Sequence, residues 1–184
     1  MDRQAIEHFL EQVDAALSAP AEMLLYGAAA FILLGEEGRT SLDLDVAGPY
    51  CQGDVAGLRR ACEQAGLPIN PPPETMHEHI EWVGMERLCL PPPGADDLVL
   101  WRGQRLTVRT VAPAALVASK LIRYDETDQA DVRSLCFRLR VTWDDVRAAA
   151  ECLPITFRRD PLVRENLENL QRDMLLWEDA HDRA

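Results

Sequence analysis

Several familiar patterns are missing from this 184-residue sequence. It has no apolar run near the roughly 20 residues that a helix needs to cross a bilayer. Its first residues, MDRQAIEHFLEQVDAAL, show a helical period with acids rather than the pattern of a signal peptide. The five cysteines are widely spaced and never form a C-x-x-C pair, which argues against a zinc ribbon and a disulfide framework. We therefore expect a soluble, cytoplasmic protein with reduced thiols and no membrane partner.

Positive charge is also scarce. The 19 Lys and Arg residues are outnumbered by 31 Asp and Glu residues, and the formal net charge is −12. Binding to the phosphate backbone of a nucleic acid depends on basic side chains, which release the counterions of the phosphates. A long nucleic acid is therefore not the expected partner. Small anionic ligands that carry a metal ion remain compatible with this charge. The 47% hydrophobic content is ample for a core, which excludes a disordered chain.

The hydrophobic pattern changes character near residue 112. Before it, the periodicity predicts helices over 4–17, 28–34 and 54–65, and strands over 22–26, 41–46, 79–83, 87–90, 98–101 and 106–111. After Pro113 the pattern is helical throughout, over 114–124, 127–140, 143–152 and 161–178. We predict an α+β fold, with a mixed β-sheet flanked by helices in residues 1–112 and a C-terminal helical subdomain, residues 113–184, packed on that core.

Two acids stand out in the predicted strand within RTSLDLDVAGP. Asp43 and Asp45 point to one face of this strand, about 7 Å apart, while its apolar residues point to the other. Such a pair either faces water or shares a cation, and a D-x-D pair alone favours the solvent side of an edge strand. Upstream, however, a strand leads into Gly27 at the mouth of a helix, where backbone amides suit a phosphate group. Together these elements predict a nucleoside triphosphate with its phosphates at Gly27 and its Mg²⁺ ions on the carboxylates.

The segment LLYGAAAFILLGEEGRTSLDLDV resembles the nucleotidyltransferase signature of the DNA polymerase β superfamily. Its R-T-S-x-D-x-D run resembles the form found in bacterial AbiEii-like and related uncharacterised nucleotidyltransferases. A second segment, LTVRTVAPAALVASKLIRYDETDQADVRSL, is similar to the part of those proteins that carries a helix lysine and a D-x-x-D stretch. The resemblance covers roughly residues 22 to 136. It implies a nucleotidyltransferase-like fold, transfer of a nucleoside monophosphate from a nucleoside triphosphate, and a place in a bacterial toxin–antitoxin or defence system.

The resemblance also implies roles for individual residues. Asp43 and Asp45 correspond to carboxylates that bind two Mg²⁺ ions, and Gly27 corresponds to the phosphate-loop glycine. Ala28 stands where similar proteins carry Gly or Ser, so a hydroxyl contact to phosphate is absent there. Lys120 corresponds to the lysine of the later helix and is expected to join catalysis across from the acids. Arg39, Ser41 and Arg123 are also expected to contact the nucleotide, and so is Lys120 in addition to its catalytic role.

A third carboxylate is expected on a later strand beside the first two. Glu81 and Glu86 are both candidates. We favour Glu86 as catalytic and metal-binding residue, since its expected strand leads to a proline run and the next hairpin much as in the similar proteins. The acceptor is expected to be a hydroxyl of a protein, an RNA end or a small molecule. The alternative is a non-catalytic module of the same fold that binds a nucleotide or a partner protein.

Lys120 can be judged without the family. It lies within the apolar stripe of the helix after Pro113, so either its stem carries the ammonium outward to solvent or the ammonium faces a polar cavity. Asp128 and Asp131 either serve the first turn of the next helix or pair with Lys120 or Arg123. The apolar stripe of the last helix predicts packing on the core, with a partner helix or a homo-oligomer seam as the alternative.

Overall fold

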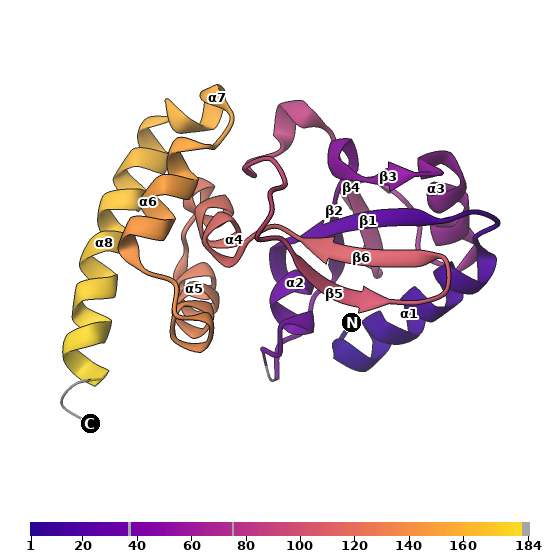
Figure 1. The fold of residues 1–184 in the computed structure, drawn as a ribbon, viewed down its shortest axis with the longest axis horizontal. Helices are drawn as coiled ribbons and strands as arrows, with labels where there is room; N and C mark the ends of the chain where they lie inside the picture. The colour runs from indigo at the N-terminus through magenta and orange to yellow at the C-terminus, as the bar shows by residue number, and fades with distance from the viewer. Residues whose placement is uncertain (37, 75, 182–184) are drawn as a thin grey trace. The chain divides into compact units, whose positions relative to one another are not determined.

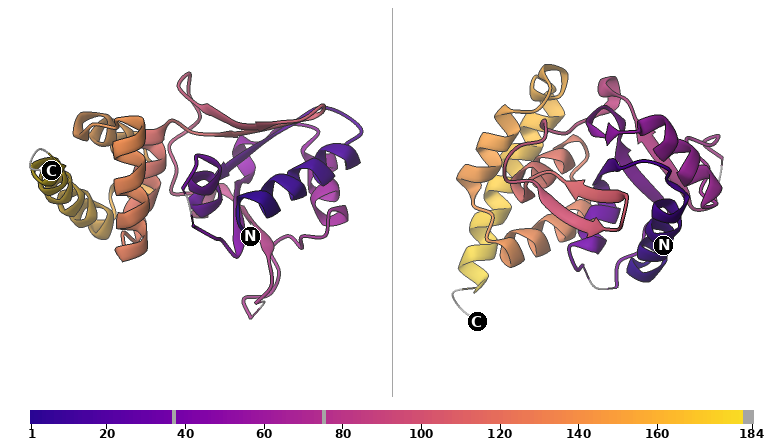
Figure 2. Two further views of the ribbon diagram at one scale, coloured as in Figure 1. Left: turned by 90° about the horizontal axis from the view of Figure 1, so that it is seen from below. Right: turned by 45° about the vertical axis from the view of Figure 1, so that its right-hand side comes forward.

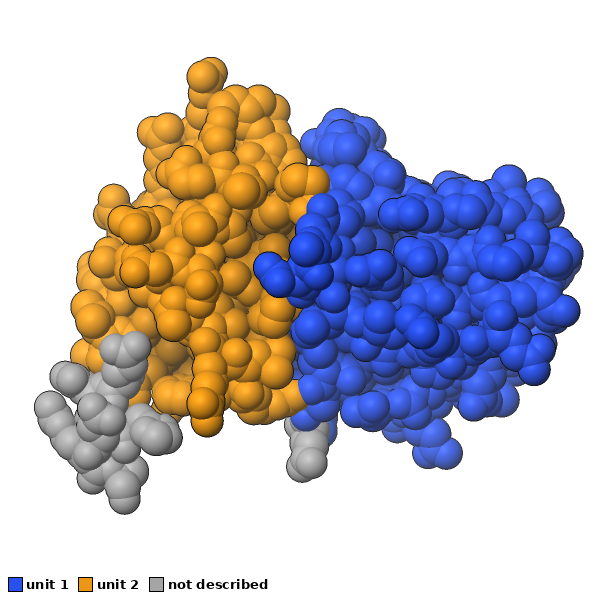
Figure 3. Space-filling view, viewed as in Figure 1, with its two compact units in different colours: residues 1–88, 93–111 blue, residues 89–92, 112–184 orange. Residues whose placement is uncertain are grey.

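The computed structural model describes residues 1–36, 38–74 and 76–181, with side chains as far as residue 177. The chain forms two compact units, coloured blue and orange in Figure 3. Unit 1 comprises Met1–Leu88 and Pro93–Val111, and unit 2 comprises Cys89–Pro92 and Ala112–Ala184. The sequence pattern did not anticipate that the short stretch Cys89–Pro92 belongs with the helical unit.

Unit 1 is a mixed sheet of six strands with helices (Figure 1), which confirms the predicted α+β fold. The strands run in the order β4-β2-β1-β6-β5, and the short β3 pairs with β1. Pairing is antiparallel for β1 with β2 and β3 and for β5 with β6, and parallel for β2 with β4 and β1 with β6. The strand bounds are β1 Ala21–Tyr26, β2 Asp43–Ala47, β3 Gln52–Gly53, β4 His79–Val83, β5 Leu98–Arg102 and β6 Leu106–Thr110.

One face of the sheet is the core of unit 1. Side chains alternate across a strand, and the alternate residues that face the core are Met23, Leu25, Leu44, Val46, Ile80, Trp82, Leu106 and Val108. Buried residues of three helices pack against them: α1 (Arg3–Ala16), α2 (Gly27–Leu33) and α3 (Val55–Gln64). The left view of Figure 2 shows these helices on one side of the sheet. The intervening residues therefore form a second face, which these helices do not cover.

Local capping and turns set the ends of these elements. Asp2 and Asp54 cap α1 and α3, each accepting a hydrogen bond from a backbone amide three residues on. At the β5–β6 turn, the Asp14 carboxylate accepts bonds from the backbone amides of Gln104, Arg105 and Leu106, at 3.0, 2.7 and 2.7 Å. Short 3-10 helices, η1 (Gly48–Tyr50) and η2 (Met85–Arg87), follow β2 and β4. The expected strand over 87–90 is wrong, because η2 occupies its start.

Unit 2 is helical, as the pattern after Pro113 predicted. Its helices are α4 Pro113–Ser119, η3 Lys120–Ile122, α5 Glu126–Leu139, α6 Trp143–Glu151, α7 Ile155–Arg158 and α8 Pro161–His181. The predicted helix 114–124 is thus an α-helix that tightens into a 3-10 turn at Lys120. On α8, Val163, Leu170 and Met174 are buried, and within unit 2 the helix contacts η3, α5, α6 and α7. No helix among the described residues is long and apolar enough to cross a membrane.

Candidate functional site

The second face of the unit 1 sheet gathers polar side chains from neighbouring strands. Asp45 of β2 lies opposite Tyr26 of β1 and opposite Glu81 of β4, and Asp43 lies opposite His79. Residues directly opposite each other in a ladder share a face of the sheet. The register therefore places Asp43, Asp45 and Glu81 together, from segments nearly 40 residues apart. We call this side, which carries Glu22, Leu24, Tyr26, Asp43, Asp45, His79, Glu81, Thr107 and Arg109, the polar face.

Glu86 is not placed in this way. The preference for Glu86 assumed a strand over 87–90, but β4 ends at Val83 and Glu86 lies in the 3-10 helix η2. Its side chain is exposed and its carboxylate lies near Gly84. Glu81, the other candidate, stands on the strand adjacent to Asp45, in register with it. Of the two candidates, Glu81 is thus the acid that the fold brings beside the pair, and Glu86 lies outside the sheet.

Gly27 lies directly against the Asp45 carboxylate. It adopts a φ of +63°, and a Cβ built there would stand 1.9 Å from Asp45 Oδ2 and 2.8 Å from its Cγ. Only glycine leaves the backbone free to approach the carboxylate in this conformation. The expectation that Gly27 and Asp45 share one place in the fold is met, although the helix that starts at Gly27, α2, has only seven residues. Ala28 follows Gly27 in α2 and is half-buried.

Polar and basic side chains contact the carboxylates of Asp43 and Glu81. The Ser41 hydroxyl donates a hydrogen bond to Asp43 Oδ1 at 2.9 Å, so Ser41 lies beside the acid pair. Glu81 lies 3.6 Å from Arg87 Nη2 and 3.8 Å from His79 Nε2. Arg39, half-buried, stands in the connection that leads into β2. The acids of the polar face are thus accompanied by cationic and hydroxyl groups from the adjacent loops.

These carboxylates are chemically suited to a hard cation such as Mg²⁺, which takes oxygen ligands. In the present side-chain arrangement they do not converge on one point: within the described ranges, no group of three or more His, Cys, Asp or Glu side chains is set to hold a metal ion. Mg²⁺ characteristically binds through one or two carboxylates together with substrate phosphates rather than in a protein cage. The carboxylates are thus oxygen donors of the kind that Mg²⁺ takes, but among the described residues they do not form a protein cage for it.

Lys120 and Arg123 belong to unit 2, where neighbouring acids hold them. Lys120 is buried, and its Nζ lies 2.7 Å from Asp128 Oδ1 and 3.1 Å from Asp131 Oδ2. Arg123 donates two hydrogen bonds to Asp128, both at 2.9 Å, and pairs with Asp125. The idea that Lys120 extends outward to solvent is wrong, and the pairing with the later acids is confirmed. Burial opposes ionisation of Asp128, but the bonds from Arg123 and Lys120 outweigh it and lower its pKa.

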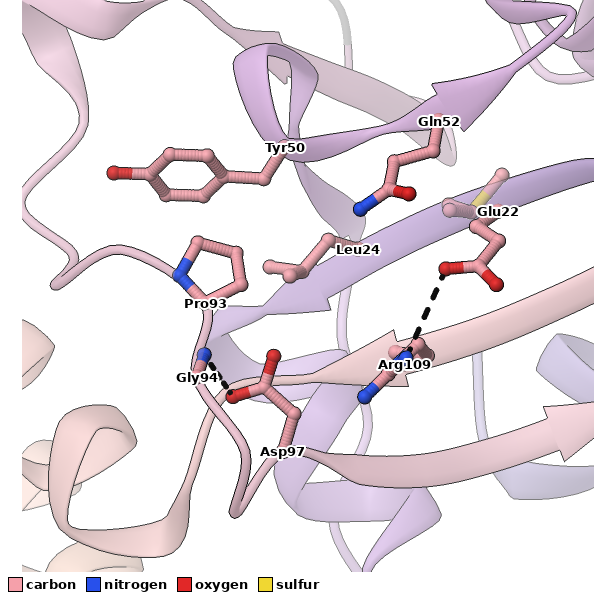
Figure 4. Close-up of a pocket in the computed structure, with 9 residues that line it drawn as sticks. Glu22, Leu24, Tyr50, Gln52, Pro93, Gly94, Asp97 and Arg109 are labelled. Atoms are coloured by element: carbon pink, nitrogen blue, oxygen red, sulfur yellow. Dashed lines mark hydrogen bonds and ion pairs between the residues drawn. The ribbon is translucent and has the colours of Figure 1, made fainter.

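Sequence reasoning missed a pocket on the polar face. Its polar lining is formed mainly by Glu22, Tyr50, Gln52, Asp97 and Arg109 (Figure 4). These residues come from β1, η1, β3, the loop before β5, and β6, so they are far apart in the sequence and form no motif. The alternation of polar and apolar residues in β1 and β6 placed Glu22 and Arg109 on one face, but no sequence signal joined them to Tyr50 or Asp97.

A family model described as "nucleotidyltransferase of unknown function (DUF6036)" matches residues 4–155. The match runs from the second residue of α1 through the rest of unit 1 and on to the start of α7, well over half of the chain. No curated protein and no solved structure matches the chain. The acids of the polar face and the glycine beside them lie within the matched residues. The chain belongs to the DUF6036 family of nucleotidyltransferases of unknown function.

Proposed function

We propose that the protein is a Mg²⁺-dependent nucleotidyltransferase that moves a nucleoside monophosphate from a nucleoside triphosphate to an acceptor hydroxyl. The observation that carries this proposal is the register of β2 and β4, which sets Glu81 beside Asp45 on one face, with Gly27 against the same carboxylate. Family membership supports the reaction class. The likeness of the Gly27-to-Asp45 segment to the DNA polymerase β superfamily signature supports the assignment of the individual residues.

The metal would be held by Asp43, Asp45 and Glu81, and when bound it neutralises charge on the phosphates and lowers the barrier to displacement. Gly27 has no side chain, so the Asp45 carboxylate lies directly against the turn at the start of α2, and a metal-bound phosphate on that carboxylate would stand beside this turn. Ser41 orients the Asp43 carboxylate by its hydrogen bond, and Arg87 and His79 do the same for Glu81 from the side. Arg39 supplies positive charge near the start of β2. Positioning of this kind provides much of the acceleration in phosphoryl transfer.

The reaction forms one bond and breaks one. The acceptor oxygen bonds to the α-phosphorus, and the bond from that phosphorus to the oxygen bridging to the β-phosphorus breaks. Pyrophosphate leaves with the bonding electrons, and the hydroxyl proton passes to a carboxylate of the polar face or to water. The acceptor belongs to a protein, an RNA end or a small molecule, and a role in a toxin–antitoxin or defence system rests on the sequence resemblance alone.

A non-catalytic nucleotide-binding module is the second candidate, favoured by Ala28, which offers no hydroxyl to a phosphate. The two candidates differ in what happens to the nucleotide after binding. An enzyme transfers label from an α-labelled nucleotide to an acceptor in cell extract, whereas a binding module leaves the extract unlabelled. Both require that the polar face bind a nucleotide.

The test is thermal unfolding of the protein with ATP, CTP, GTP or UTP, each with and without Mg²⁺. We expect one or more nucleotides to raise the unfolding temperature only with Mg²⁺, and an Asp43→Ala, Asp45→Ala double variant to lose the effect. Glu81→Gln and Glu86→Gln form a matched pair on the same segment. We expect Glu81→Gln to weaken the nucleotide effect and Glu86→Gln to leave it intact. Stabilisation by no nucleotide at all would refute the proposal.

A further inference from the structure

The polar face carries a pocket beside the acids. It has a volume of about 230 Å³, and its lining belongs wholly to unit 1. In Figure 4, Tyr50 and Gln52 stand on one side and Asp97 and Arg109 on the other, with Leu24 of β1 between them. Glu22 reaches in from β1 toward Arg109, and the ring of Pro93 lies near the ring of Tyr50.

The register fixes where this pocket lies relative to the acids. Tyr26 is the β1 residue opposite Asp45, and Gly27 follows it. Leu24 is two residues before Tyr26, so the pocket begins about 7 Å along β1 from the point beside Asp45, in the direction away from Gly27. Arg109 of β6 lies opposite Leu24 and shares its face. Measured along β1, Asp45 is therefore level with Tyr26, between Gly27 and the pocket residue Leu24.

This order matters for the reaction. In an in-line displacement at phosphorus, the attacking oxygen and the leaving group lie on opposite sides of the phosphorus atom. If pyrophosphate lies at the Gly27 turn, as in the proposed function on which this step rests, the attacking hydroxyl approaches from the side of the pocket. We propose that the pocket is the acceptor subsite and that it binds a sugar-sized, hydroxyl-bearing group of a small molecule.

The lining fits such a group in chemistry. The Nε–H of Arg109 is buried and has no hydrogen-bond partner among the described residues, while its Nη1 lies 3.9 Å from the Glu22 carboxylate. A buried donor without a partner is unfavourable, and a ligand oxygen would satisfy it. Gln52 both donates and accepts, and the carboxylates of Glu22 and Asp97 accept. Burial raises the pKa of the Tyr50 hydroxyl, so this group is a neutral phenol at pH 7.

Size and charge narrow the class of acceptor. A volume of about 230 Å³ is below the roughly 300–1,000 Å³ of pockets for drug-sized ligands, so it has room for one sugar-sized group. Two carboxylates, Glu22 and Asp97, accompany the single guanidinium of Arg109, which disfavours a chain of phosphates. The rings of Tyr50 and Pro93 give the apolar surface on which the non-polar side of a sugar ring packs. A neutral or cationic polyhydroxylated molecule matches these features better than a polynucleotide end.

The experiment compares two pocket variants, Arg109→Gln and Gln52→Leu, with a matched control, Arg60→Gln. Arg60 is exposed on α3, which covers the opposite face of the sheet. Two readouts are taken: the stabilisation by nucleotide with Mg²⁺, and the transfer of label from α-labelled nucleotide to an ultrafiltrate of cell extract. We expect both pocket variants to keep the nucleotide stabilisation but to transfer more slowly. The loss should be about ten- to hundredfold for Arg109→Gln, the factor for one lost hydrogen bond to a charged group, and about two- to tenfold for Gln52→Leu, which removes a hydrogen bond between neutral groups. A higher ultrafiltrate concentration should partly restore the rate.

Each of the other outcomes would refute a different part of the proposal. Pocket variants that transfer at the wild-type rate would show that the acceptor binds elsewhere. Pocket variants that also lose nucleotide stabilisation would show that the pocket holds the nucleotide itself. Label that appears on RNA or protein, with none on small molecules, would refute the acceptor class. If no nucleotide stabilises the wild-type protein, the proposed function fails, and the acceptor assignment fails with it.

Discussion

Replacing Gly27 by alanine should separate stability from function at the polar face. The new Cβ would stand 1.9 Å from Asp45 Oδ2, a distance that non-bonded atoms do not tolerate. The atom it meets is the end of a side chain, so the collision is relieved when the Asp45 carboxylate rotates away. The positive φ of +63° adds strain of about 1–2 kcal/mol for a residue with a Cβ. We therefore expect a loss of about 1–2 kcal/mol in the free energy of unfolding and a displaced Asp45.

Gly66→Ala is the matched control, because Gly66 also has a positive φ, +97°, and a Cβ there meets nothing within 4 Å. Urea unfolding should show similar losses for the two variants, since both carry backbone strain. Stabilisation by nucleotide with Mg²⁺ should disappear only in Gly27→Ala, where the carboxylate has moved. A Gly27→Ala protein that binds nucleotide like the Gly66→Ala protein would refute the view that the Gly27–Asp45 contact forms the nucleotide site.

Three further predictions concern the rest of the molecule. Lys120→Met should destabilise the protein by about 3–5 kcal/mol in urea unfolding, because it removes the buried ammonium that pairs with Asp131 and shares Asp128 with Arg123. A loss below about 1 kcal/mol would contradict a structural role for this ion pair. The lowered pKa of Asp128 means that the folded state binds its proton less readily than the unfolded state. The stabilisation from the Asp128 carboxylate is therefore complete above its ordinary pKa of 3.8 and is lost as the pH falls through the folded-state pKa. Between roughly pH 5 and pH 1, the free energy of unfolding should therefore depend less steeply on pH in Asp128→Asn than in the wild type. Finally, a thiol reagent at pH 8 should react rapidly with Cys152 and with the other four cysteines only after unfolding. Burial raises the thiol pKa to about 11 at Cys51 and to about 12 at Cys62, Cys89 and Cys136. More than one rapidly reacting thiol in the native protein would contradict the burial of these four side chains.

Much of the secondary structure could be predicted from the sequence, because the periodicity of hydrophobic residues depends only on neighbouring positions in the chain. The alternation in β1 and β2 and the period in α1 and α3 were predicted to within a residue or two. Local sequence also accounts for the start of α6, where Thr142 and Asp145 form a reciprocal capping box. The strand predicted over 87–90 failed because short apolar runs carry little information, and a 3-10 turn after β4 competes with an extended strand for the same residues.

The sequence by itself determined the acidic pair, since Asp43 and Asp45 follow from period-two alternation in one short strand, and it pointed to Gly27 through the strand-to-helix turn. Only the tertiary structure shows that Glu81 rather than Glu86 lies beside Asp45, because that placement depends on which strand pairs with β2 and in which register. The same holds for the partners of Lys120 and for the pocket around Arg109, both made by contacts between elements. Spacing along a chain fixes which side chains share one strand or helix face, whereas strand pairing and helix packing bring distant segments together.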